Sequence, residues 1–249
     1  MSNKNSIIEG KINNNIPVCI GPISNLEDYV KEDWWNKIFN AYYLKTDGDV
    51  VEDDSITSEE IDYFLKLLAI KSDDSILDLC CGQGRHAIEL ASRGFTNIEG
   101  LDRSRYLIKK SRLTSKKKGV NCRFREGDAR KLPYKTDSFN TILILGNSFG
   151  YFEIISDDLQ VLKESNRTLK PWGKVYIDLT DGEYLKSHFQ PRSWEWIDKT
   201  LFVCRERSLS LDKQRLISRE VITHANKGVL VDQFYACLLY TSPSPRDRS

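Results

Sequence analysis

The feature that most constrains this chain is the stretch 75–94, in which an apolar run is followed by two glycines and then by an amphipathic pattern. Residues 76–79 predict a short buried strand of a parallel sheet, and residues 87–91 repeat at helical spacing. Gly82 and Gly84 lie between the two patterns, where they allow a ligand to approach the backbone and the free N–H groups of a helix start. The stretch therefore predicts a strand, a glycine turn and a helix that can hold a cofactor.

Two ligand classes use such a turn. Gly82-x-Gly84-x-x-Ala87 fits the dinucleotide pattern, and Asp102 follows at about the spacing of an acid that contacts a ribose hydroxyl. An NAD-dependent oxidoreductase is therefore one interpretation. Asp78 favours a different ligand class, because a carboxylate at the end of the strand suits a zwitterionic, cationic ligand better than a pyrophosphate.

The pattern Asp78-x-Cys80-x-Gly82-x-Gly84 resembles motif I of the class I (Rossmann-like) S-adenosylmethionine-dependent methyltransferases, usually written D/E-x-G-x-G-x-G. Cys80 replaces the first glycine, at a position where the family often has a small residue. The resemblance implies that S-adenosylmethionine is the cofactor. It also implies that Asp78 and the backbone near Cys80 and Gly82 hold its methionine end, with Gly84 in the same binding turn.

Two further acids end predicted strands. Residues 97–101 predict a strand that ends at Asp102, and residues 121–126 predict another that is followed by Asp128 and Ala129. In a right-handed doubly wound sheet, acids in these places reach the same carboxyl edge as Asp78. The resemblance implies that Asp102 binds the ribose hydroxyls and that Asp128 and Ala129 bind the adenine.

The most apolar predicted strand, 141–145, leads into a loop that in the family lies beside the transferable methyl group. The resemblance implies that the backbone near Gly146 approaches the methionine ammonium, and that Asn147 or Tyr151 contacts the acceptor. The loop's aromatic residues can instead simply pack. In the N-terminal segment, aromatic residues recur at i, i+4 spacing and predict one helix. Three of its side chains are further candidates to cover the pocket, namely Trp35, Tyr42 and Tyr43. A catalytic base is not identified; the possible bases are Tyr42, Tyr43, Tyr151, His188 and His224.

The alternation of strands and helices predicts an α/β fold with a doubly wound, mostly parallel sheet and helices on both faces. A helix over 157–169, a turn over 170–173 and a fifth strand over 174–179 continue it. From about residue 191 the pattern changes to an antiparallel β insertion, with Asn226-Lys227-Gly228 as a hairpin signal. The four strands expected there are 193–198, 201–209, 215–223 and 229–235.

We expect five parts along the chain. These are a flexible leader (1–20), an N-terminal helical cap (21–60), the Rossmann-like core (61–190), the β insertion or cap (191–236) and a non-native tail (237–249). Within the cap, Ser24-x-x-Glu27 and Thr57-x-x-Glu60 fit capping boxes and each predict a helix start. The tail resembles a translated sequencing adapter, with a natural Pro/Ser-rich tail as the alternative. If it is foreign, the chain is truncated and the last strands of the family fold are missing.

Composition restricts the partners. Lys and Arg number 37 against 36 Asp and Glu, so no global field favours nucleic acid or an anionic membrane. The chain has no signal-peptide pattern or long apolar span, and its six cysteines contain no C-x-x-C pair. We therefore expect reduced thiols and a cytoplasmic location. The three histidines have no zinc-like spacing, so no metal is expected.

The sequence thus predicts an S-adenosylmethionine-dependent methyltransferase for a small-molecule acceptor, with no nucleic-acid or membrane partner and an open oligomeric state. Three alternatives remain. A nucleic-acid methyltransferase is one, although the Asp/Asn-Pro-Pro-Tyr/Phe motif of many amino-group methylases is lacking. The others are the oxidoreductase and a cofactor-binding protein that has lost turnover by truncation.

Overall fold

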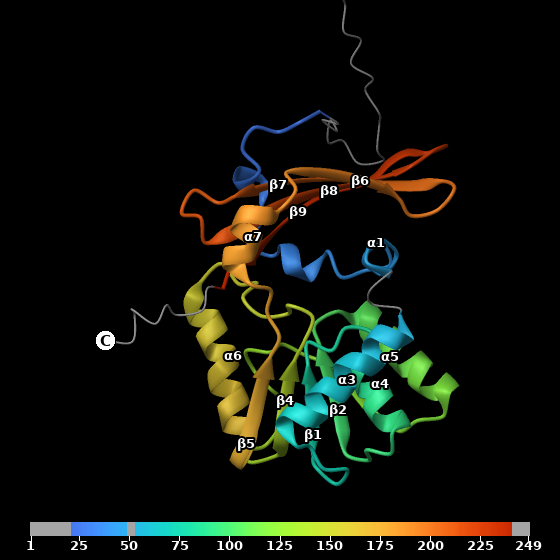
Figure 1. Ribbon diagram of the computed structural model, residues 1–249, viewed down its shortest axis with the longest axis vertical. Coiled ribbons are helices and arrows are strands. Elements are labelled where there is room, and N and C mark those ends of the chain that lie inside the picture. The colour runs from blue at the N-terminus through green and yellow to red at the C-terminus, as the bar shows by residue number, and fades with distance from the viewer. Residues whose placement is uncertain (1–20, 49–52, 241–249) are drawn as a thin grey trace, which may run out of the picture. The chain divides into compact units, whose positions relative to one another are not determined.

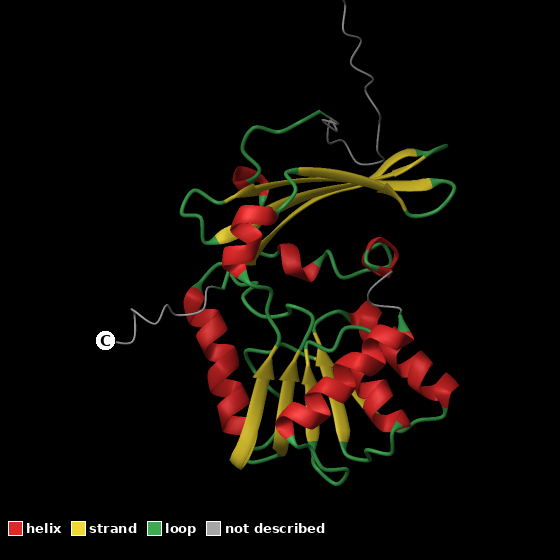
Figure 2. Ribbon diagram, viewed as in Figure 1, coloured by secondary structure: helices red, strands yellow, loops and turns green. Residues whose placement is uncertain are grey.

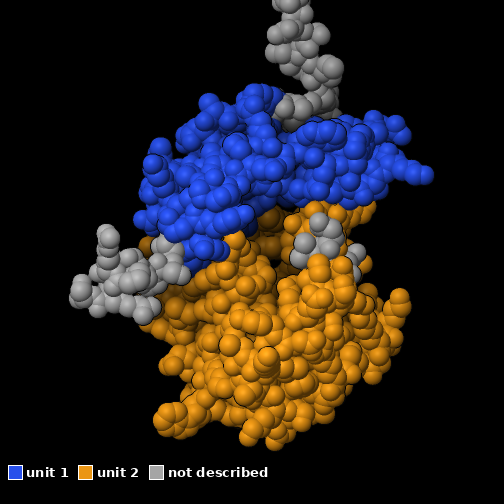
Figure 3. All heavy atoms as spheres, viewed as in Figure 1, with its two compact units in different colours: residues 1–34, 181–249 blue, residues 35–180 orange. Residues whose placement is uncertain are grey.

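The computed structural model describes residues 21–48 and 53–240, in two compact units. One unit comprises residues 35–180, and the other comprises residues 1–34 with 181–249 (Figure 3). The expected leader (1–20) and most of the expected tail (241–249) lie outside the described residues.

The unit of residues 35–180 is built on a five-stranded parallel sheet with the order β3-β2-β1-β4-β5 (Figure 1). Its strands are β1 (Ile76–Leu79), β2 (Ile98–Asp102), β3 (Arg123–Glu126), β4 (Phe139–Ile144) and β5 (Leu169–Ile177). The chain moves outward from β1 in one direction through β2 and β3, and then crosses back to β4 and β5. This reversal between β1 and β4 is where an open α/β sheet binds its ligands.

Helices cover the sheet, as Figure 2 shows. They are α3 (Asp54–Leu68), α4 (Arg85–Ser92), α5 (Arg105–Lys118) and α6 (Ile155–Thr168). Helices α4 and α5 contact β2 and each other, α3 packs on α4, and α6 contacts β5. Because right-handed crossovers on the two sides of β1 put their helices on opposite faces, α4 and α5 lie on one face and α6 on the other. The predicted doubly wound fold is confirmed.

The core forms where the apolar strands meet the apolar stripes of these helices. Every residue of β1 is buried, including Asp78, which interrupts the apolar residues that predicted a buried strand. Ile76 and Leu143 of the sheet share a cluster with Ile88 of α4, Ile108 of α5 and Ile61 of α3. This cluster fixes α3 and the glycine turn on one rigid frame.

The N-terminal segment differs from the prediction. Instead of one aromatic helix it contains two short 3-10 helices, η1 (Glu27–Tyr29) and η2 (Trp34–Asn36), and a single α-helical turn, α1 (Tyr43–Thr46). No side-chain hydrogen bond caps η1, so the capping box proposed at Ser24 was wrong. Local aromatic spacing did not determine a helix here, because the tertiary contacts of individual rings override weak propensity.

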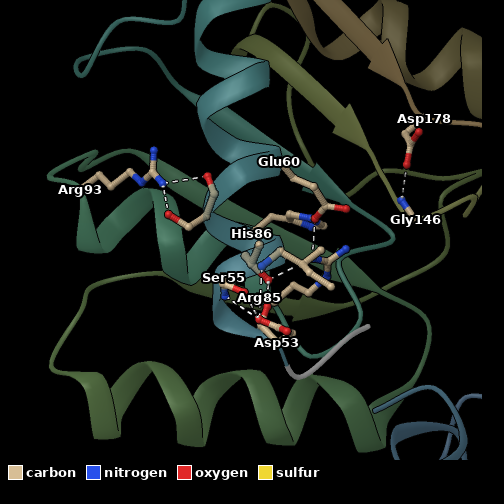
Figure 4. A network of polar contacts seen from close by, with 11 residues as sticks. Asp53, Ser55, Glu60, Arg85, His86, Arg93, Gly146 and Asp178 are labelled. Atoms are coloured by element: carbon tan, nitrogen blue, oxygen red, sulfur yellow. Dashed lines mark hydrogen bonds and ion pairs between the residues drawn. The ribbon is translucent and has the colours of Figure 1, made fainter. Parts of the chain in front are cut away.

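The start of α3 also differs from the prediction. Asp53 is its N-cap, and its carboxylate accepts the N–H groups of Ser55 and Ile56 at 2.7 and 3.3 Å (Figure 4). Thr57 lies inside the helix, where its hydroxyl donates to the Asp53 carbonyl at 3.0 Å. The capping box over Thr57 and Glu60 was therefore wrong. The Glu60 carboxylate instead contacts Arg85 and His86 of α4.

The predicted turn at 170–173 is an outward excursion within β5. Leu169 pairs with Phe139 and Lys174 pairs with Thr141, so four residues of β5 stand opposite a single residue of β4. Trp172 in this excursion has a left-handed φ of 67° and is fully exposed. Among the described residues, the parallel sheet ends at β5, which pairs with β4 alone.

The other unit carries a four-stranded antiparallel sheet with the order β6-β7-β8-β9, which confirms the predicted β insertion. Its elements are α7 (Gly182–His188), β6 (Arg192–Trp196), β7 (Leu201–Leu209), β8 (Arg215–His224) and β9 (Gly228–Leu238). Arg219 is buried in this sheet and pairs with Asp232 at 2.6 Å and with Glu206 at 3.1 Å. Cys237 and Leu238, which we expected in the tail, belong to β9.

Candidate functional site

The glycine turn after β1 holds three alternate residues in the left-handed conformation. Cys80, Gly82 and Gly84 have φ angles of 62°, 54° and 79°. This alternation is the physical reason for a motif with glycine at every second position. Cys80 adopts the conformation with a side chain, at a cost of roughly 1–2 kcal/mol.

The two glycines of the turn have different surroundings. A Cβ on Gly82 would meet only Leu107, at 3.8 Å, so the backbone there is open to a ligand. A Cβ on Gly84 would lie 2.6 Å from the Phe124 ring and 2.9 Å from Ser111. Gly84 is thus required for the close packing of α4 against α5 and β3, and it does not line the cavity.

A cavity lies at the carboxyl ends of the strands, within the unit of residues 35–180. Six of the residues predicted for the site line it: Cys80, Gly82, Asp102, Asp128, Ala129 and Tyr151. They come from the ends of four different strands, β1 to β4, which the parallel topology brings to one edge.

Asp102 is the last residue of β2 and is almost completely buried. One carboxylate oxygen accepts the Gly82 N–H at 2.8 Å, and the other accepts the Ser104 N–H at 2.7 Å. Burial raises the pKa of Asp102, whereas these two hydrogen bonds lower it. Each oxygen keeps a second lone pair for a ligand hydroxyl, and the two N–H groups hold the carboxylate in a fixed orientation.

Asp128 follows β3 and is held by Arg130. The guanidinium reaches one carboxylate oxygen through Nε at 3.1 Å and the other through Nη2 at 2.7 Å, and the Arg130 backbone N–H donates at 2.9 Å. Partial burial raises the pKa of Asp128, but the hydrogen bonds from Arg130 outweigh it and hold the pKa below its usual value. The carboxylate therefore stays ionised and accepts hydrogen bonds from a ligand.

Asp78, which the motif predicts at the methionine end of the cofactor, does not line the cavity. It is the third residue of the four-residue β1, its side chain is buried, and Oδ2 accepts no hydrogen bond from the described part of the chain. Burial raises the pKa of Asp78 to about 6, against the opposing effects of His86 and the Ala87 N–H. The carboxylate therefore lies at the start of α4, behind the glycine turn.

Three other predicted site residues also lie outside the cavity lining. The Gly146 N–H donates to Asp178 at 3.2 Å (Figure 4), and the Asn147 side chain accepts the Thr180 N–H at 3.2 Å. Both therefore tie the end of β4 to the end of β5. Tyr42 is replaced in the lining by its neighbour Tyr43.

A polar network behind the turn fixes the start of α4. Glu60 of α3 contacts His86 Nε2 at 2.8 Å and accepts a hydrogen bond from the Arg85 guanidinium (Figure 4). Burial raises the pKa of Glu60, but the hydrogen bonds with His86 and Arg85 outweigh burial and lower the pKa to about 2. Arg85 also donates to the Thr57 hydroxyl at 2.9 Å. The network joins α3 to the residues that follow Gly84. The sequence did not predict this network.

Aromatic side chains form much of the remaining lining, and we call Trp35, Phe39, Tyr43, Tyr151 and Phe152 the aromatic wall. Phe39 stacks on Tyr151 at 5.9 Å and meets Tyr43 edge-on at 5.1 Å, and Trp35 meets Phe152 edge-on at 5.3 Å between ring centroids. Burial is the main cause that raises the pKa of Tyr43.

The expectation that Trp35 or Tyr43 reaches the pocket agrees with this geometry, since both line it. The sequence did not predict Phe39 in the lining or Arg130 as the partner of Asp128, because neither residue belongs to a recognisable motif. His188 and His224 belong to the other unit.

Comparisons with known proteins agree with this architecture. Residues 76–173 match the model of a family described as a methyltransferase domain. The chain is 40% identical to a demethylmenaquinone methyltransferase of Lactobacillus johnsonii over 120 residues, which are 46% of this chain and 47% of that protein. It is 25% identical to the 27-O-demethylrifamycin SV methyltransferase of Amycolatopsis mediterranei over 157 residues, 60% of this chain and 53% of that protein. The chain thus spans about half the length of the curated relatives it matches.

Solved structures share the fold over a larger part of the chain. An S-adenosylmethionine-dependent methyltransferase from Clostridium acetobutylicum aligns with a TM-score of 0.67 and 18% identity, over 86% of this chain and 84% of that one. The CcbJ methyltransferase from Streptomyces caelestis aligns with a TM-score of 0.65 and 16% identity, over 84% and 85%. At this level of identity, these likenesses show the fold alone.

The parallel sheet with its glycine turn, and the cavity at the strand ends, define a Rossmann-like ligand-binding domain. Within this domain, residues 76–173 are similar to the methyltransferase-domain family. Within the described ranges, no helix has both the length and the apolar character needed to cross a membrane.

Proposed function

We propose that this chain is an S-adenosylmethionine-dependent methyltransferase that acts on a small-molecule acceptor. The observation that carries the proposal is the convergence of Asp102 and Asp128, from successive strands, on one cavity that the open backbone of Gly82 also lines. A dehydrogenase needs the first acid and the glycine turn, but it does not need the second acid.

The chain's own groups fit the parts of this cofactor. Asp102, oriented by two backbone N–H groups, would accept hydrogen bonds from the two ribose hydroxyls. Asp128 is kept ionised by Arg130 and would accept a hydrogen bond from the adenine amino group, next to the Ala129 backbone. The turn from Cys80 to Gly82 leaves room for the methionine end. Asp78 lies behind the turn and outside the cavity lining, so this proposal gives it no direct contact with the cofactor.

The chemistry of such a site is mainly positioning. Bound S-adenosylmethionine supplies a methyl group on a sulfonium, which is already electrophilic. The protein has to hold an acceptor atom in line with that methyl group and to exclude water, and such alignment can supply about 7–11 kcal/mol in favourable cases. The aromatic wall gives the apolar surface for this task, and Tyr43 and Tyr151 are the members that carry a hydroxyl.

Two observations favour a small-molecule acceptor. The named relatives are methyltransferases of demethylmenaquinone and of 27-O-demethylrifamycin SV, which are both small molecules. The cavity lining contains Asp102, Asp128 and Asp158 but only one basic residue, Arg103, so it offers little to a phosphate backbone. We therefore keep the proposal of no nucleic-acid partner.

Calorimetric titration of the full chain with S-adenosylhomocysteine and, separately, with NAD tests the proposal. We expect saturable binding of the nucleoside and none of NAD. Binding of NAD alone would refute the assignment and favour the oxidoreductase. Transfer of a radiolabelled methyl group to a metabolite pool then separates an enzyme from a protein that binds the cofactor without turnover.

A further inference from the structure

Arg130 makes an unusual set of contacts for a residue that does not itself line the cavity. Its guanidinium binds the Asp128 carboxylate through Nε and Nη2, at 3.1 and 2.7 Å. Its third nitrogen, Nη1, binds Asp157 in the first turn of α6 at 2.6 Å. All three nitrogens thus point to carboxylates from two different segments, which fixes the guanidinium plane.

The same guanidinium also lies over two rings of the aromatic wall, which are close neighbours of each other. Its central carbon is 4.5 Å from the centroid of the Phe152 ring and 5.4 Å from that of the Trp35 ring. Both distances are within the range of a cation–π interaction. Trp35 and Phe152 also contact each other edge-on, so the three side chains form one packed group.

This arrangement connects the two ends of the proposed site. Asp128 comes from the loop after β3, Phe152 from the loop after β4 and Trp35 from η2, and all three line the cavity. Arg130 is the shared neighbour of these residues. A shift of the Asp128 carboxylate toward or away from a ligand therefore moves the charge on which both rings pack.

We propose that Arg130 is a positioning residue that couples the orientation of the Asp128 carboxylate to the position of the Trp35 and Phe152 rings. A ligand bound at Asp128 is then sensed at the aromatic wall. The inference rests on the proposed function, because it takes the nucleoside as the ligand of Asp128.

Stability alone would not reveal this role. The side chains of Arg130 and Asp128 are 30% and 29% exposed, and ion pairs at such sites contribute little to stability. The effect should therefore appear in ligand binding and in the ring environment. Lysine keeps the charge but loses the planar fork and the stacking face, so Arg130→Lys removes the coupling without removing the cation.

Arg167 provides a matched control. It also binds one carboxylate through two nitrogens, with 2.8 and 2.7 Å to Glu164, and its side chain is 34% exposed. Neither Arg167 nor Glu164 lines the cavity. Arg167→Lys therefore repeats the chemical change at a comparable ion pair that has no part in the site.

The experiment measures the dissociation constant of S-adenosylhomocysteine and the tryptophan emission on binding, with Trp35→Phe to identify the Trp35 signal. We expect Arg130→Lys to weaken binding about tenfold, which corresponds to the loss of one good charge-assisted hydrogen bond. We also expect it to abolish the Trp35 emission change, while Arg167→Lys behaves as wild type and thermal unfolding shows both variants folded.

A dissociation constant and a Trp35 emission change that stay as in wild type in Arg130→Lys would overturn the inference alone. The same loss in Arg167→Lys would also overturn it, since the effect would then be a general one. A wild-type chain that does not bind S-adenosylhomocysteine would overturn the proposed function and this inference together.

Discussion

The side-chain geometry of single residues separates the three acids that the sequence grouped together. Asp102 is the final residue of β2, and Asp128 follows β3, so both reach the edge of the sheet. Asp78 lies one residue before the end of β1 and pairs across to Gly100. In this register Asp102 lies two residues beyond the residue opposite Asp78, so both side chains point to the same face of the sheet but Asp102 lies closer to its carboxyl edge. The sequence predicted which acids end strands, but it could not resolve this difference.

The left-handed conformation of Cys80 can be tested by two substitutions. Cys80→Gly should leave the free energy of unfolding within about 1 kcal/mol of wild type, because relief of strain is offset by a more flexible unfolded chain. Cys80→Val should lower the free energy of unfolding by about 2 kcal/mol, since a β-branched residue is a true outlier at this φ. Urea denaturation followed by circular dichroism measures both. Equal losses in the two variants would show that the turn does not hold residue 80 at positive φ.

Among the elements, the βα units were predictable and the N-terminal segment was not. The apolar runs of β1 and β4 and the stripe of α4 gave strands and a helix close to their observed bounds. In the segment before α1, the aromatic residues do not form one stripe. Trp34 packs on Tyr235 within the unit of the antiparallel sheet, whereas Trp35 packs on Phe152 in the other unit. Such distant partners leave no local pattern, so the sequence could not predict the break.

The packing of α4 against its neighbours depends on the absence of a side chain at Gly84. Gly84→Ala should destabilise the chain by about 2–4 kcal/mol, because the new methyl group meets Phe124 and Ser111 and also has to adopt a positive φ. Gly94→Ala is the control, since Gly94 has a φ of 92° but nothing within 4 Å of its Cβ. Gly94→Ala should lower the free energy of unfolding by only about 1 kcal/mol, which is the cost of placing a side chain at positive φ. Chemical denaturation of both variants measures the difference, and losses of equal size would contradict the steric account.

At the scale of the whole molecule, the buried carboxyl of Asp78 makes stability depend on pH. Burial raises its pKa from 3.8 to about 6 in the folded chain, so between these values the folded chain binds the proton more tightly than the unfolded chain. Stability from this group is therefore present at low pH and is lost as the pH rises through about 6.

The comparison of wild type with Asp78→Asn isolates this effect, because the amide does not titrate. Between pH 5 and pH 7.5, the wild type should lose about 1 kcal/mol of unfolding free energy relative to the variant. Urea denaturation at the two pH values measures the change. A constant difference between the two proteins would mean that Asp78 does not titrate in this range.

The central proposal is that Asp102, at the carboxyl edge of the sheet, holds the ribose of S-adenosylmethionine. The most direct test is the dissociation constant of S-adenosylhomocysteine for the wild-type chain and for Asp102→Ala, with thermal unfolding to show that the variant is folded. Loss of two charge-assisted hydrogen bonds predicts a rise of about 100-fold or more. A folded Asp102→Ala chain that binds the nucleoside as tightly as wild type would contradict the account.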